Sequence, residues 1–418
     1  MHIAYLTAEY PPQPGGVGDY TRCLARALVQ QGACVTVLTG QNEQTNDAAS
    51  VIPASGQPDL VAGIRRWNWY CWRDTIAALD RLRPDILHIQ YQTGAYDMHP
   101  AINLLPWRLH QLPGRPRLLV TFHDVREPYL FPKAGPLRRW VNVRLARDAD
   151  QVIVTNQEDA ARLLQNQVQS STLPIGSNIS VNPPPGYQRD AWRKHLGVAP
   201  DDFLIAYFGL LSPNKGFDLL LQAFHQLIQS LPDHVSRRLR LFLVGGSATN
   251  PTDRAFAAAI ENQLQSLNLS AYLLRTGYLD ERAVSAHLLA ADCAVLPFRE
   301  GASLRSGSLL AVMAHGLATI TTLNPSPPTP LPQGERGVTA VGNTLPTLVD
   351  GKHALLVPSA NVRDLSAALQ RLMQDHTLRQ SLGAAAQTFV RPFAWDTIAQ
   401  QHRQLYQSLK PTSSIGHA

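Results

Sequence analysis

The feature that most constrains the fold of this chain is a regular alternation of apolar runs and amphipathic stretches. It begins with an apolar run at 2–8 (HIAYLTA), a turn-rich segment at 11–20 (PPQPGGVGDY), an amphipathic stretch at 21–32 and a second apolar run at 33–40. This order predicts a β-loop-α-β unit, in which the two strands are parallel and the crossover is right-handed. The alternation continues, with strands expected at 85–90, 117–122 and 151–155 and helices at 69–82, 136–147 and 157–166.

A second series of the same kind starts after a proline-rich connector at 183–186 (PPPG). Two successive α/β series predict two doubly wound domains, which we place at 1–185 and 186–392. Ligands of such folds bind beyond the carboxyl ends of the strands, so two facing domains would form a cleft. The expected elements of the second series are strands at 203–208, 240–245, 272–275 and 293–297 and helices at 215–231, 253–267, 280–290 and 306–315.

The composition narrows the classes of function. The 418 residues are 44% hydrophobic and 16% charged, which is typical of a globular protein. The net charge of +6 indicates an anionic partner, and a nucleic acid, an acidic membrane surface or a phosphorylated small molecule would each fit. No nucleic-acid-binding motif accompanies this charge, so we expect no nucleic acid partner. The chain has no apolar stretch of spanning length, no basic signal-peptide start and only four scattered cysteines, so we expect a cytoplasmic protein without disulfides or zinc.

Two loops at expected strand ends carry residues suited to a phosphorylated ligand. Gly15 and Gly16 would let a ligand approach the backbone at a helix N-terminus, although a tight βα turn explains the same glycines. Lys215 lies between the end of a strand and the start of a helix, where a cation suits a phosphate. The alternative is that Lys215 is a solvated loop lysine.

The segment after the strand at 293–297 has the densest set of candidate residues. Glu300 could accept hydrogen bonds from sugar hydroxyls. A diphosphate could be held by the side chain of Arg305 and by the N–H groups of Ala302, Ser303 and Leu304 at the start of the following helix.

Short motifs follow one another in a fixed order through nearly the whole chain. They are GGVGDY (15–20), LHIQY (87–91), VTFHD (120–124), DADQVIVTN (148–156), LPIGSN (173–178), FGLLSPNKG (208–216), LRTGYLDER (274–282), REGASLRSGSLLAVMAHG (299–316), DGKHALLVPSANVRDLSAAL (350–369) and FAWDTIAQQHRQLYQSL (393–409). Together these motifs resemble those of the family-4 retaining glycosyltransferases, which have the GT-B architecture. The resemblance implies two doubly wound, Rossmann-like α/β domains facing across a cleft, with a C-terminal helix at 393–410 that crosses back to the first domain. We expect the tail at 411–418 to be disordered.

The resemblance also implies roles for individual residues. Lys215 matches the family's phosphate-binding lysine, Glu300 the first glutamate of an E-x7-E motif that contacts the donor sugar, and His123 the histidine that faces the transferred sugar. A nucleotide-sugar donor is expected mainly on the second domain and an acceptor mainly on the first, with no cofactor and no metal. The remaining donor-side residues are Gly15, Gly16, Gly209, Gly277, Tyr278, Gly301, Ala302, Ser303, Leu304, Arg305 and Ser308, and the acceptor-side residues are His88, Gln90, Tyr91 and Asp124.

Two positions depart from the family pattern. Ser308 stands where the family commonly has a second glutamate for the ribose, and Leu210 stands where it has a phosphate-binding arginine. A serine can still bind a ribose hydroxyl as a shorter, neutral group. We expect Arg305 or Arg299 to restore the lost positive charge. A catalytically degenerate site is the alternative.

Other candidates have a structural and a functional interpretation. Asp148 and Asp150 superficially match a metal-binding DxD, but acids before a buried strand and after an arginine-rich helix fit surface and capping roles better. The helix at 135–147 would bury Leu137, Trp140, Val141 and Leu145 and expose a basic face, or dock on anionic lipid. The proline-rich segment at 324–337 is expected to be a surface loop or a substrate lid.

The sequence therefore predicts a cytoplasmic enzyme, either free or associated with a membrane, that moves a hexosyl unit from a nucleotide sugar, with retention, to a glycan or a lipid-linked acceptor. We expect this reaction to serve the synthesis of surface polysaccharide or glycoconjugate. The alternatives are a binding or partner subunit without catalysis, and a nucleotide-sugar epimerase or hydrolase.

Overall fold

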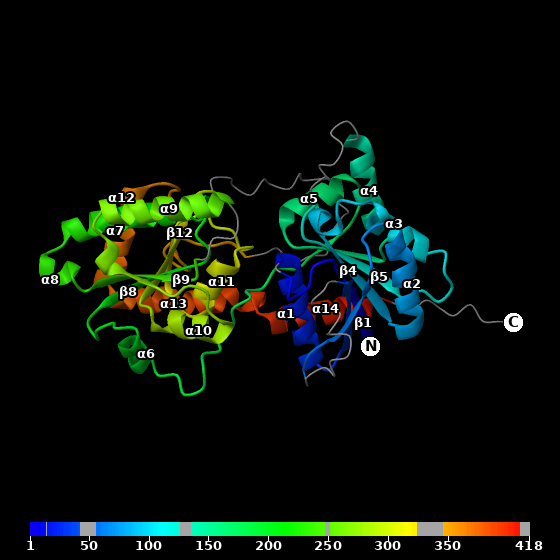
Figure 1. The fold of residues 1–418 in the computed structure, drawn as a ribbon, viewed down its shortest axis with the longest axis horizontal. Helices are drawn as coiled ribbons and strands as arrows, with labels where there is room; N and C mark the ends of the chain where they lie inside the picture. The colour runs from blue at the N-terminus through cyan, green and yellow to red at the C-terminus, as the bar shows by residue number, and fades with distance from the viewer. Residues whose placement is uncertain (14, 42–55, 126–134, 247–250, 324–345, 410–418) are drawn as a thin grey trace. The chain divides into compact units, whose positions relative to one another are not determined.

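The structure is a computed structural model that describes residues 1–13, 15–41, 56–125, 135–246, 251–323 and 346–409, and the side chains of 135–138 are outside this description. These residues form two compact units (Figure 1). The first unit contains 1–176 and 394–409, and the second contains 177–323 and 346–393. Among the described residues, the chain passes between the units at 176/177 and at 393/394. Residues 177–185, which the sequence led us to place in the first domain, belong to the second unit.

The first unit is built on a parallel sheet with the strand order β3-β2-β1-β4-β5-β6-β7. Its central strands are apolar on both faces, because helices cover the sheet on both sides. The strands are β1 (His2–Leu6), β2 (Cys34–Gly40), β3 (Asp59–Ile64), β4 (Ile86–Tyr91), β5 (Arg117–Phe122), β6 (Gln151–Val154) and β7 (Ser171–Thr172).

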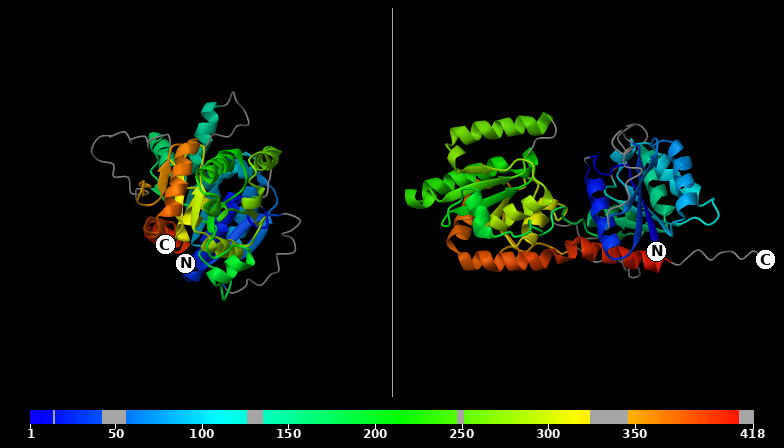
Figure 2. Two further views of the ribbon diagram at one scale, coloured as in Figure 1. Left: turned by 90° about the vertical axis from the view of Figure 1, so that its left-hand side faces the viewer. Right: turned by 60° about the horizontal axis from the view of Figure 1, so that its bottom comes forward.

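Alternate residues of each strand enter two separate cores. Tyr5 packs with Leu24 of α1 (Gly16–Gln30) and Ile398 of α14 (Trp395–Ser408), whereas Leu6 packs with Leu79 and Leu105 on the other face. Figure 2 shows α14 running along the sheet beside α1. The second core lies under α2 (Tyr70–Leu82), α3 (Ala101–Leu109), α4 (Gly135–Arg147) and α5 (Gln157–Gln165), with a 3-10 turn, η2 (Thr93–Tyr96).

The second unit repeats this architecture with the strand order β10-β9-β8-β11-β12-β13, again all parallel. Figure 1 shows α7, α9 and α12 along one face of the sheet. The strands are β8 (Phe203–Phe208), β9 (Leu239–Val244), β10 (Leu273–Arg275), β11 (Cys293–Leu296), β12 (Ala318–Thr322) and β13 (Leu355–Val357). The helices are α6 (Arg189–His195), η4 (Pro213–Lys215), α7 (Phe217–Ser230), α8 (Asp233–Ser236), α9 (Pro251–Ser266), η5 (Ser270–Tyr272), α10 (Glu281–Ala290), α11 (Gly307–Ala314), α12 (Val362–Gln374), α13 (His376–Val390) and η6 (Arg391–Phe393).

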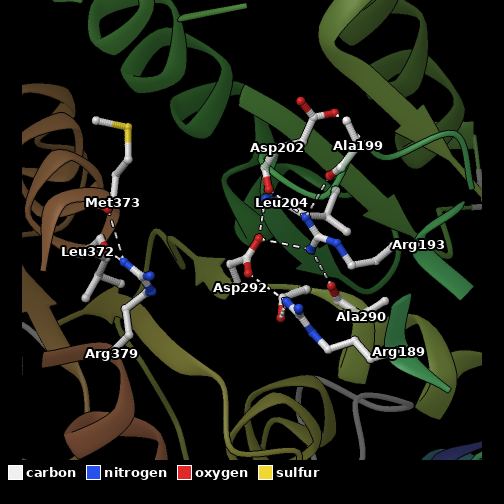
Figure 3. Close-up of polar contacts among 11 residues, drawn as sticks. Arg189, Arg193, Ala199, Asp202, Leu204, Ala290, Asp292, Leu372, Met373 and Arg379 are labelled. Atoms are coloured by element: carbon white, nitrogen blue, oxygen red, sulfur yellow. Dashed lines mark hydrogen bonds and ion pairs between the residues drawn. The ribbon is translucent and has the colours of Figure 1, made fainter. Parts of the chain in front are cut away.

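A buried arginine fixes α6 to this second sheet. Arg193 is only 4% exposed and donates hydrogen bonds to the carboxylate of Asp292 at 3.1 Å and to the carbonyls of Ala290 and Asp202 at 2.8 and 2.6 Å (Figure 3). Asp292 also accepts from Arg189 at 2.7 Å and from the N–H of Leu204 in β8 at 2.7 Å. The guanidinium fork thus joins the first helix after the connector to two neighbouring strands.

Several local features differ from the sequence predictions. Helix α1 begins at Gly16, within the segment expected to be a loop, and β3 and α3 were not expected at all. Helix α4 buries Leu145, but Trp140, which we had placed on the core face, is 50% exposed; the side chain of Leu137 lies outside the described residues. Within the part of the chain that the structure describes, none of the helices is both long and apolar enough to cross a membrane. The proline-rich segment at 324–337 and the tail at 411–418 are outside the described residues.

Candidate functional site

The candidate donor-side residues of the second unit converge beyond the carboxyl end of β8. Gly209 follows this strand with a φ of +139°, a conformation that L side chains rarely adopt. A methyl group on Gly209 would lie 4.0 Å from the Nζ of Lys215 and 3.9 Å from the Oγ of Ser308. Three residues from two separate motifs, 208–216 and 299–316, therefore meet at one point, as the sequence predicts for a ligand site at this sheet edge.

Lys215 is held in a partly buried position beside Ser308. Its Nζ donates to the Oγ of Ser308 at 3.5 Å and lies 5.4 Å from the ring centroid of Phe298. Burial lowers the pKa of Lys215, because desolvation disfavours the ammonium form. An anionic ligand would balance the charge of the partly buried ammonium group. The position of Lys215 therefore fits a phosphate-binding lysine better than it fits a solvated loop lysine.

Gly216 explains why Lys215 lies at this point. Its φ is +70°, and a methyl group there would overlap the carbonyl oxygen of Pro297, the residue that follows β11. Only glycine allows the chain after η4 to pass so close to the end of β11. This close approach brings Lys215 to the loop that carries Glu300, and sequence reasoning missed it.

The N-terminus of α11 adds a short series of hydroxyl groups. The side chain of Ser306 caps this helix by accepting from the N–H of Leu309, and its Oγ lies 3.0 Å from the Oγ of Ser308. Ser308 in turn accepts from Lys215. The two serine hydroxyls thus lie in line with the ammonium group at the positive end of a helix, an arrangement suited to oxygen atoms of a diphosphate.

The loop that leads to α11 supplies fewer free donors than expected. The N–H of Ala302, a predicted diphosphate ligand, instead donates to the carbonyl of Thr322 at 2.9 Å, and the N–H of Gly301 donates to Phe298 at 3.2 Å. Among the described residues, the N–H groups of Ser303 and Leu304 have no backbone acceptor. Ala302 is therefore corrected to a structural role, which ties the loop to β12.

Two arginines, Arg305 and Arg299, were expected to replace the positive charge that Leu210 does not supply, and the contacts of Arg299 leave Arg305 as the candidate. Arg299 forms an ion pair with Asp218 and donates to the carbonyl of Pro213 at 3.1 Å, so its guanidinium holds the loop to α7. This engagement argues against the predicted compensation by Arg299. Arg305 and Glu300 are exposed, and Leu210 is 45% exposed.

The candidate base-binding residues lie at the end of β10. Gly277 has a φ of +68° and forms an isolated bridge with Gly245, while Tyr278 is 88% exposed. A bare backbone beside an exposed aromatic ring can pack against a flat nucleobase. This arrangement is compatible with the role that the sequence predicts for both residues.

The glycines at 15–18, at the start of α1, differ in their surroundings: two pack against the chain and one faces open space. A methyl group on Gly15 would overlap the carboxylate of Glu9, and one on Gly18 would lie 3.0 Å from the carbonyl oxygen of Glu9. These two glycines therefore let the end of β1 pack on the first turn of α1. By contrast, a methyl group on Gly16 would meet nothing within 4 Å, so Gly16 faces open space.

Glu9 was not expected in this loop. Its carboxyl group accepts from the N–H of Val17 at the start of α1, and burial raises its pKa. The N-terminus of α1 is thus already bonded to the carboxyl group of Glu9.

His123 lies just beyond β5, at the carboxyl edge of the first sheet. Its N–H donates to the carbonyl of Tyr91 at 2.9 Å, and its Nε2 lies 2.9 Å from the Oε1 of Gln90. The edge of the Tyr20 ring packs on the imidazole at a centroid distance of 4.7 Å. His123 is 7% exposed, so the residue as a whole is buried.

The acceptor-side residues of β4 are more deeply buried than a direct acceptor contact requires. His88 and Gln90 are fully buried, and Tyr91 is 1% exposed. The Nδ1 of His88 is 2.8 Å from the hydroxyl of Tyr406 in α14, and its Nε2 is 2.8 Å from the hydroxyl of Thr121. Burial, followed by the neighbouring histidines, lowers the pKa of His88 well below its ordinary value. These contacts give the side chain of His88 a structural role. Asp124, the fourth acceptor-side residue, is half-buried and remains a candidate for an acceptor contact.

The DxD pair serves ion pairs within the first unit. Asp150 accepts two hydrogen bonds from Arg115, at 2.7 and 3.0 Å, and one from the N–H of Leu118, and Asp148 accepts from Arg144 at 2.6 Å. The arginines hold the pKa of Asp150 below its usual range although burial opposes them. In the described portion of the chain, no three His, Cys, Asp or Glu residues are grouped as a metal site would need.

Two α/β units with all-parallel sheets, each with candidate ligand residues at the carboxyl edge of its sheet, define a protein of the GT-B class. Family comparison agrees: residues 15–175 match the "Glycosyl transferase 4-like domain" and residues 202–375 match "Glycosyl transferases group 1". The chain belongs to the GT4-like family of GT-B glycosyltransferases.

Known proteins of this kind are similar over the full length. D-inositol 3-phosphate glycosyltransferase of Jonesia denitrificans is 25% identical over 438 aligned positions, which cover 99% of this chain and 96% of the relative. Among solved structures, sucrose-phosphate synthase from Thermosynechococcus elongatus superposes with a TM-score of 0.69 at 24% identity, covering 97% of this chain and 98% of that one. Anabaena HepE in complex with UDP superposes with a TM-score of 0.70 at 16% identity, covering 98% and 100%.

Proposed function

We propose that this glycosyltransferase transfers a hexosyl unit from a nucleotide sugar to a glycan or lipid-linked acceptor with retention of anomeric configuration. The observation that carries this proposal is the convergence of Lys215, Ser308 and Gly209 at the carboxyl edge of the second sheet. A partly buried ammonium group with a lowered pKa and, among the described residues, no carboxylate partner is suited to a diphosphate. The UDP complex of HepE, a structural neighbour, supports this class of donor.

The chemistry required of the site follows from the bond that breaks. Cleavage between the anomeric carbon and the diphosphate develops negative charge on the departing phosphate. Lys215 would neutralise this charge, with Ser308 and the N-terminus of α11 beside it, and one well-placed donor of this kind contributes roughly 3–4 kcal/mol to the transition state. In a front-face displacement the departing phosphate oxygen accepts the proton of the acceptor hydroxyl, so the protein need not supply a nucleophile.

Other side chains would bind the transferred sugar and the nucleobase of the donor. Glu300 would accept hydrogen bonds from hydroxyls of the transferred sugar, and His123 would contact the same sugar. Tyr278 and the backbone of Gly277 would hold the nucleobase. Because Asp148 and Asp150 are engaged by arginines, we propose that the diphosphate is neutralised by the side chains named above without a resident metal.

The first test asks which nucleotide the site binds and whether Lys215 holds it. UDP-, GDP-, ADP- and TDP-sugars are added separately, and one of them should raise the melting temperature, since a ligand that binds only the folded state stabilises it. Lys215→Ala should abolish that increase and lower kcat by roughly 100-fold or more, in the presence or absence of EDTA. Lys352→Ala removes an exposed lysine of the same unit and serves as the control with equal net charge.

Two outcomes would count against the proposal. If none of the nucleotide sugars shifts the melting temperature, the chain does not bind such a donor. If Lys215→Ala binds and turns over donor like Lys352→Ala, the diphosphate does not lie at this sheet edge. Donor consumption without any acceptor would instead indicate a hydrolase or epimerase.

We further propose a polymeric or lipid-linked acceptor used at the cytoplasmic face of a membrane, in surface polysaccharide or glycoconjugate synthesis. Support comes from the exposed Trp140 beside the arginines of α4, and from the four free cysteines, which suit a reducing compartment. Co-sedimentation with vesicles of phosphatidylglycerol should exceed that with phosphatidylcholine, and Trp140→Ser should reduce it. Equal sedimentation with both lipids would remove the membrane part of the proposal.

A further inference from the structure

The ammonium group of Lys215 lies over the face of an aromatic ring. Its Nζ is 5.4 Å from the centroid of the Phe298 ring, which is within the range of a cation–π interaction. Phe298 is 8% exposed and belongs to the hydrophobic core of the second unit. The face of an aromatic ring carries partial negative charge, and it attracts a cation more strongly in a partly desolvated position than in water.

Backbone contacts place these two residues opposite one another. The N–H of Arg299 donates to the carbonyl of Asn214 at 3.0 Å. Gly216 approaches Pro297 so closely that a methyl group on it would overlap the carbonyl oxygen of that proline. The residues on either side of the lysine thus contact the residues on either side of the phenylalanine, and the two segments are joined on both sides of the pair.

The backbone of Phe298 is also held from the interior of the unit. Its N–H donates to the carbonyl of Leu296 at 3.0 Å, which closes a tight turn at the end of β11. Its carbonyl oxygen accepts from the hydroxyl of Thr322 in β12 at 2.6 Å and from the N–H of Gly301 at 3.2 Å. Because the backbone is bonded and the side chain is packed in the core, the ring has a fixed place beneath the ammonium group.

The other contacts of the ammonium group do not neutralise its charge. Among the described residues, its hydrogen-bond partner is the neutral hydroxyl of Ser308 at 3.5 Å, and no carboxylate pairs with it. A carboxylate would hold Lys215 but would also compete with an anionic ligand, whereas a ring face attracts the cation and leaves its charge in place. Burial lowers the pKa of Lys215, and the ring acts in the opposite direction because it favours the ammonium form.

We propose that Phe298 is a positioning residue: the face of its ring holds the ammonium group of Lys215 beyond the carboxyl end of β8 and keeps it charged, without cancelling the charge that a phosphate group needs. The holding of the lysine concerns the free protein alone. The use of its charge by a phosphate group rests on the proposed function, in which Lys215 binds the diphosphate of the donor. Phe298 acts through Lys215 and is not itself a ligand of the donor.

Stepwise fluorination of the ring tests the interaction with almost no change in shape. Phenylalanine that carries one, two or three fluorine atoms is incorporated at position 298 by stop-codon suppression, and each fluorine withdraws charge from the ring face. The pKa of Lys215 is followed by NMR in protein labelled with 13C at the Cε of lysine. The sequence has five lysines, at positions 133, 194, 215, 352 and 410, and Lys215→Arg identifies the signal of residue 215.

We expect the pKa of Lys215 to fall with each added fluorine, because the charged form loses its partner while burial is unchanged. The matched control is the same series at Phe389, which is 9% exposed in the same core and has no contact with Lys215 among those of the described residues. That series should leave the pKa of Lys215 unchanged. A constant pKa along the series at position 298 would overturn the proposal, as would an equal fall in the series at position 389.

Genetically simpler variants test the consequence for an anionic ligand. Phe298→Leu keeps an apolar side chain but removes the ring, and it should weaken the binding of inorganic pyrophosphate, measured by calorimetry, by about three- to ten-fold. Phe298→Tyr keeps a ring and should retain most of the affinity. Phe389→Leu makes the same change elsewhere in the core and should bind pyrophosphate like the unchanged protein.

The two measurements separate this proposal from the proposed function. If fluorination lowers the pKa of Lys215 but Phe298→Leu binds pyrophosphate with unchanged affinity, Phe298 does position the lysine and the diphosphate contact assigned to Lys215 fails. If Lys215→Ala abolishes pyrophosphate binding while fluorination and Phe298→Leu change nothing, the diphosphate contact stands and the positioning role of Phe298 is overturned.

Discussion

The buried guanidinium of Arg193 allows the stability of the second unit to be tested at one residue. In Arg193→Ala the carbonyls of Ala290 and Asp202 lose their donor, and Asp292 loses one of its two arginines. Removing one partner of a buried ion pair costs about 3–5 kcal/mol. Asp292 keeps Arg189 and the N–H of Leu204, so we expect a value near the lower end, about 3 kcal/mol.

A matched variant is available on the same carboxylate. Arg189 bonds to the other oxygen of Asp292, but its side chain is 43% exposed, whereas that of Arg193 is 4% exposed. Solvent screens an exposed pair, so Arg189→Ala should cost about 1 kcal/mol or less. The contrast between the two variants isolates burial, because both remove an arginine that bonds to Asp292.

Hydrogen exchange measured by mass spectrometry is the assay of choice, because it reports stability peptide by peptide, whereas one melting temperature for a chain of two units does not tell which unit has lost stability. A loss of 3 kcal/mol corresponds to a rise of roughly 100-fold in the exchange rate of the most protected amides. Peptides from β8 and β11 should show this rise in Arg193→Ala, while peptides from β1 should not change. Equal rates in Arg193→Ala and Arg189→Ala would refute the reasoning, as would an equal response of β1.

Two further predictions concern the first unit and the lysine loop. Burial lowers the pKa of His402 in α14 to about 4, so below pH 6.5 the unfolded chain binds a proton there that the folded chain does not. The contribution of His402 to stability should be complete above that pH and fall by about 2 kcal/mol on acidification to pH 5, in addition to the loss from His88, whose pKa burial also lowers. Thermal unfolding should show this loss, and His402→Gln should reduce it; a loss of the same size in His402→Gln would contradict the assignment. Gly216→Ala should weaken donor binding at least ten-fold, because the new methyl group would overlap Pro297, whereas Gly351→Ala, at a similar φ of +69° with open space around it, should leave donor binding unchanged. Equal donor affinity in both variants, measured by calorimetry, would show that the approach to Pro297 does not position Lys215.

The sheets could be predicted from the sequence because their strands are short apolar runs covered on both faces. The runs at 117–122 and 203–208 became β5 and β8 with the same bounds. Strand β3 escaped notice because its middle residues are only half-buried, and α3 because it contains Pro106. The start of α1 was missed because Gly15, Gly16 and Gly18 resemble a loop. Gly15 and Gly18 leave room for Glu9 and Tyr10, which is a matter of packing that the sequence does not reveal.

In the candidate site too, residues with a local motif could be predicted from the sequence, whereas contacts between distant residues could not. Lys215 and Ser308 could be named from motifs, and Gly209 joins them at the sheet edge. The ion pair that engages Arg299 could not be anticipated, because Asp218 lies 81 residues away in sequence. Likewise, the bond between His88 and Tyr406 joins residues 318 apart, so the interpretation of His88 as an acceptor contact had no local signal against it.

The return of the chain to its first unit affects how the protein is made. Residues 394–409 are translated after the whole second unit, yet Ile398, Ala399 and Tyr406 complete one of the two cores around β1. During synthesis on the ribosome, the first sheet therefore keeps the face that α14 will cover exposed until the whole second unit has been made. The second unit can fold during this time. The N-terminal half matures last, and a stop codon before Trp395 would leave it with an apolar surface that chaperones and proteases recognise.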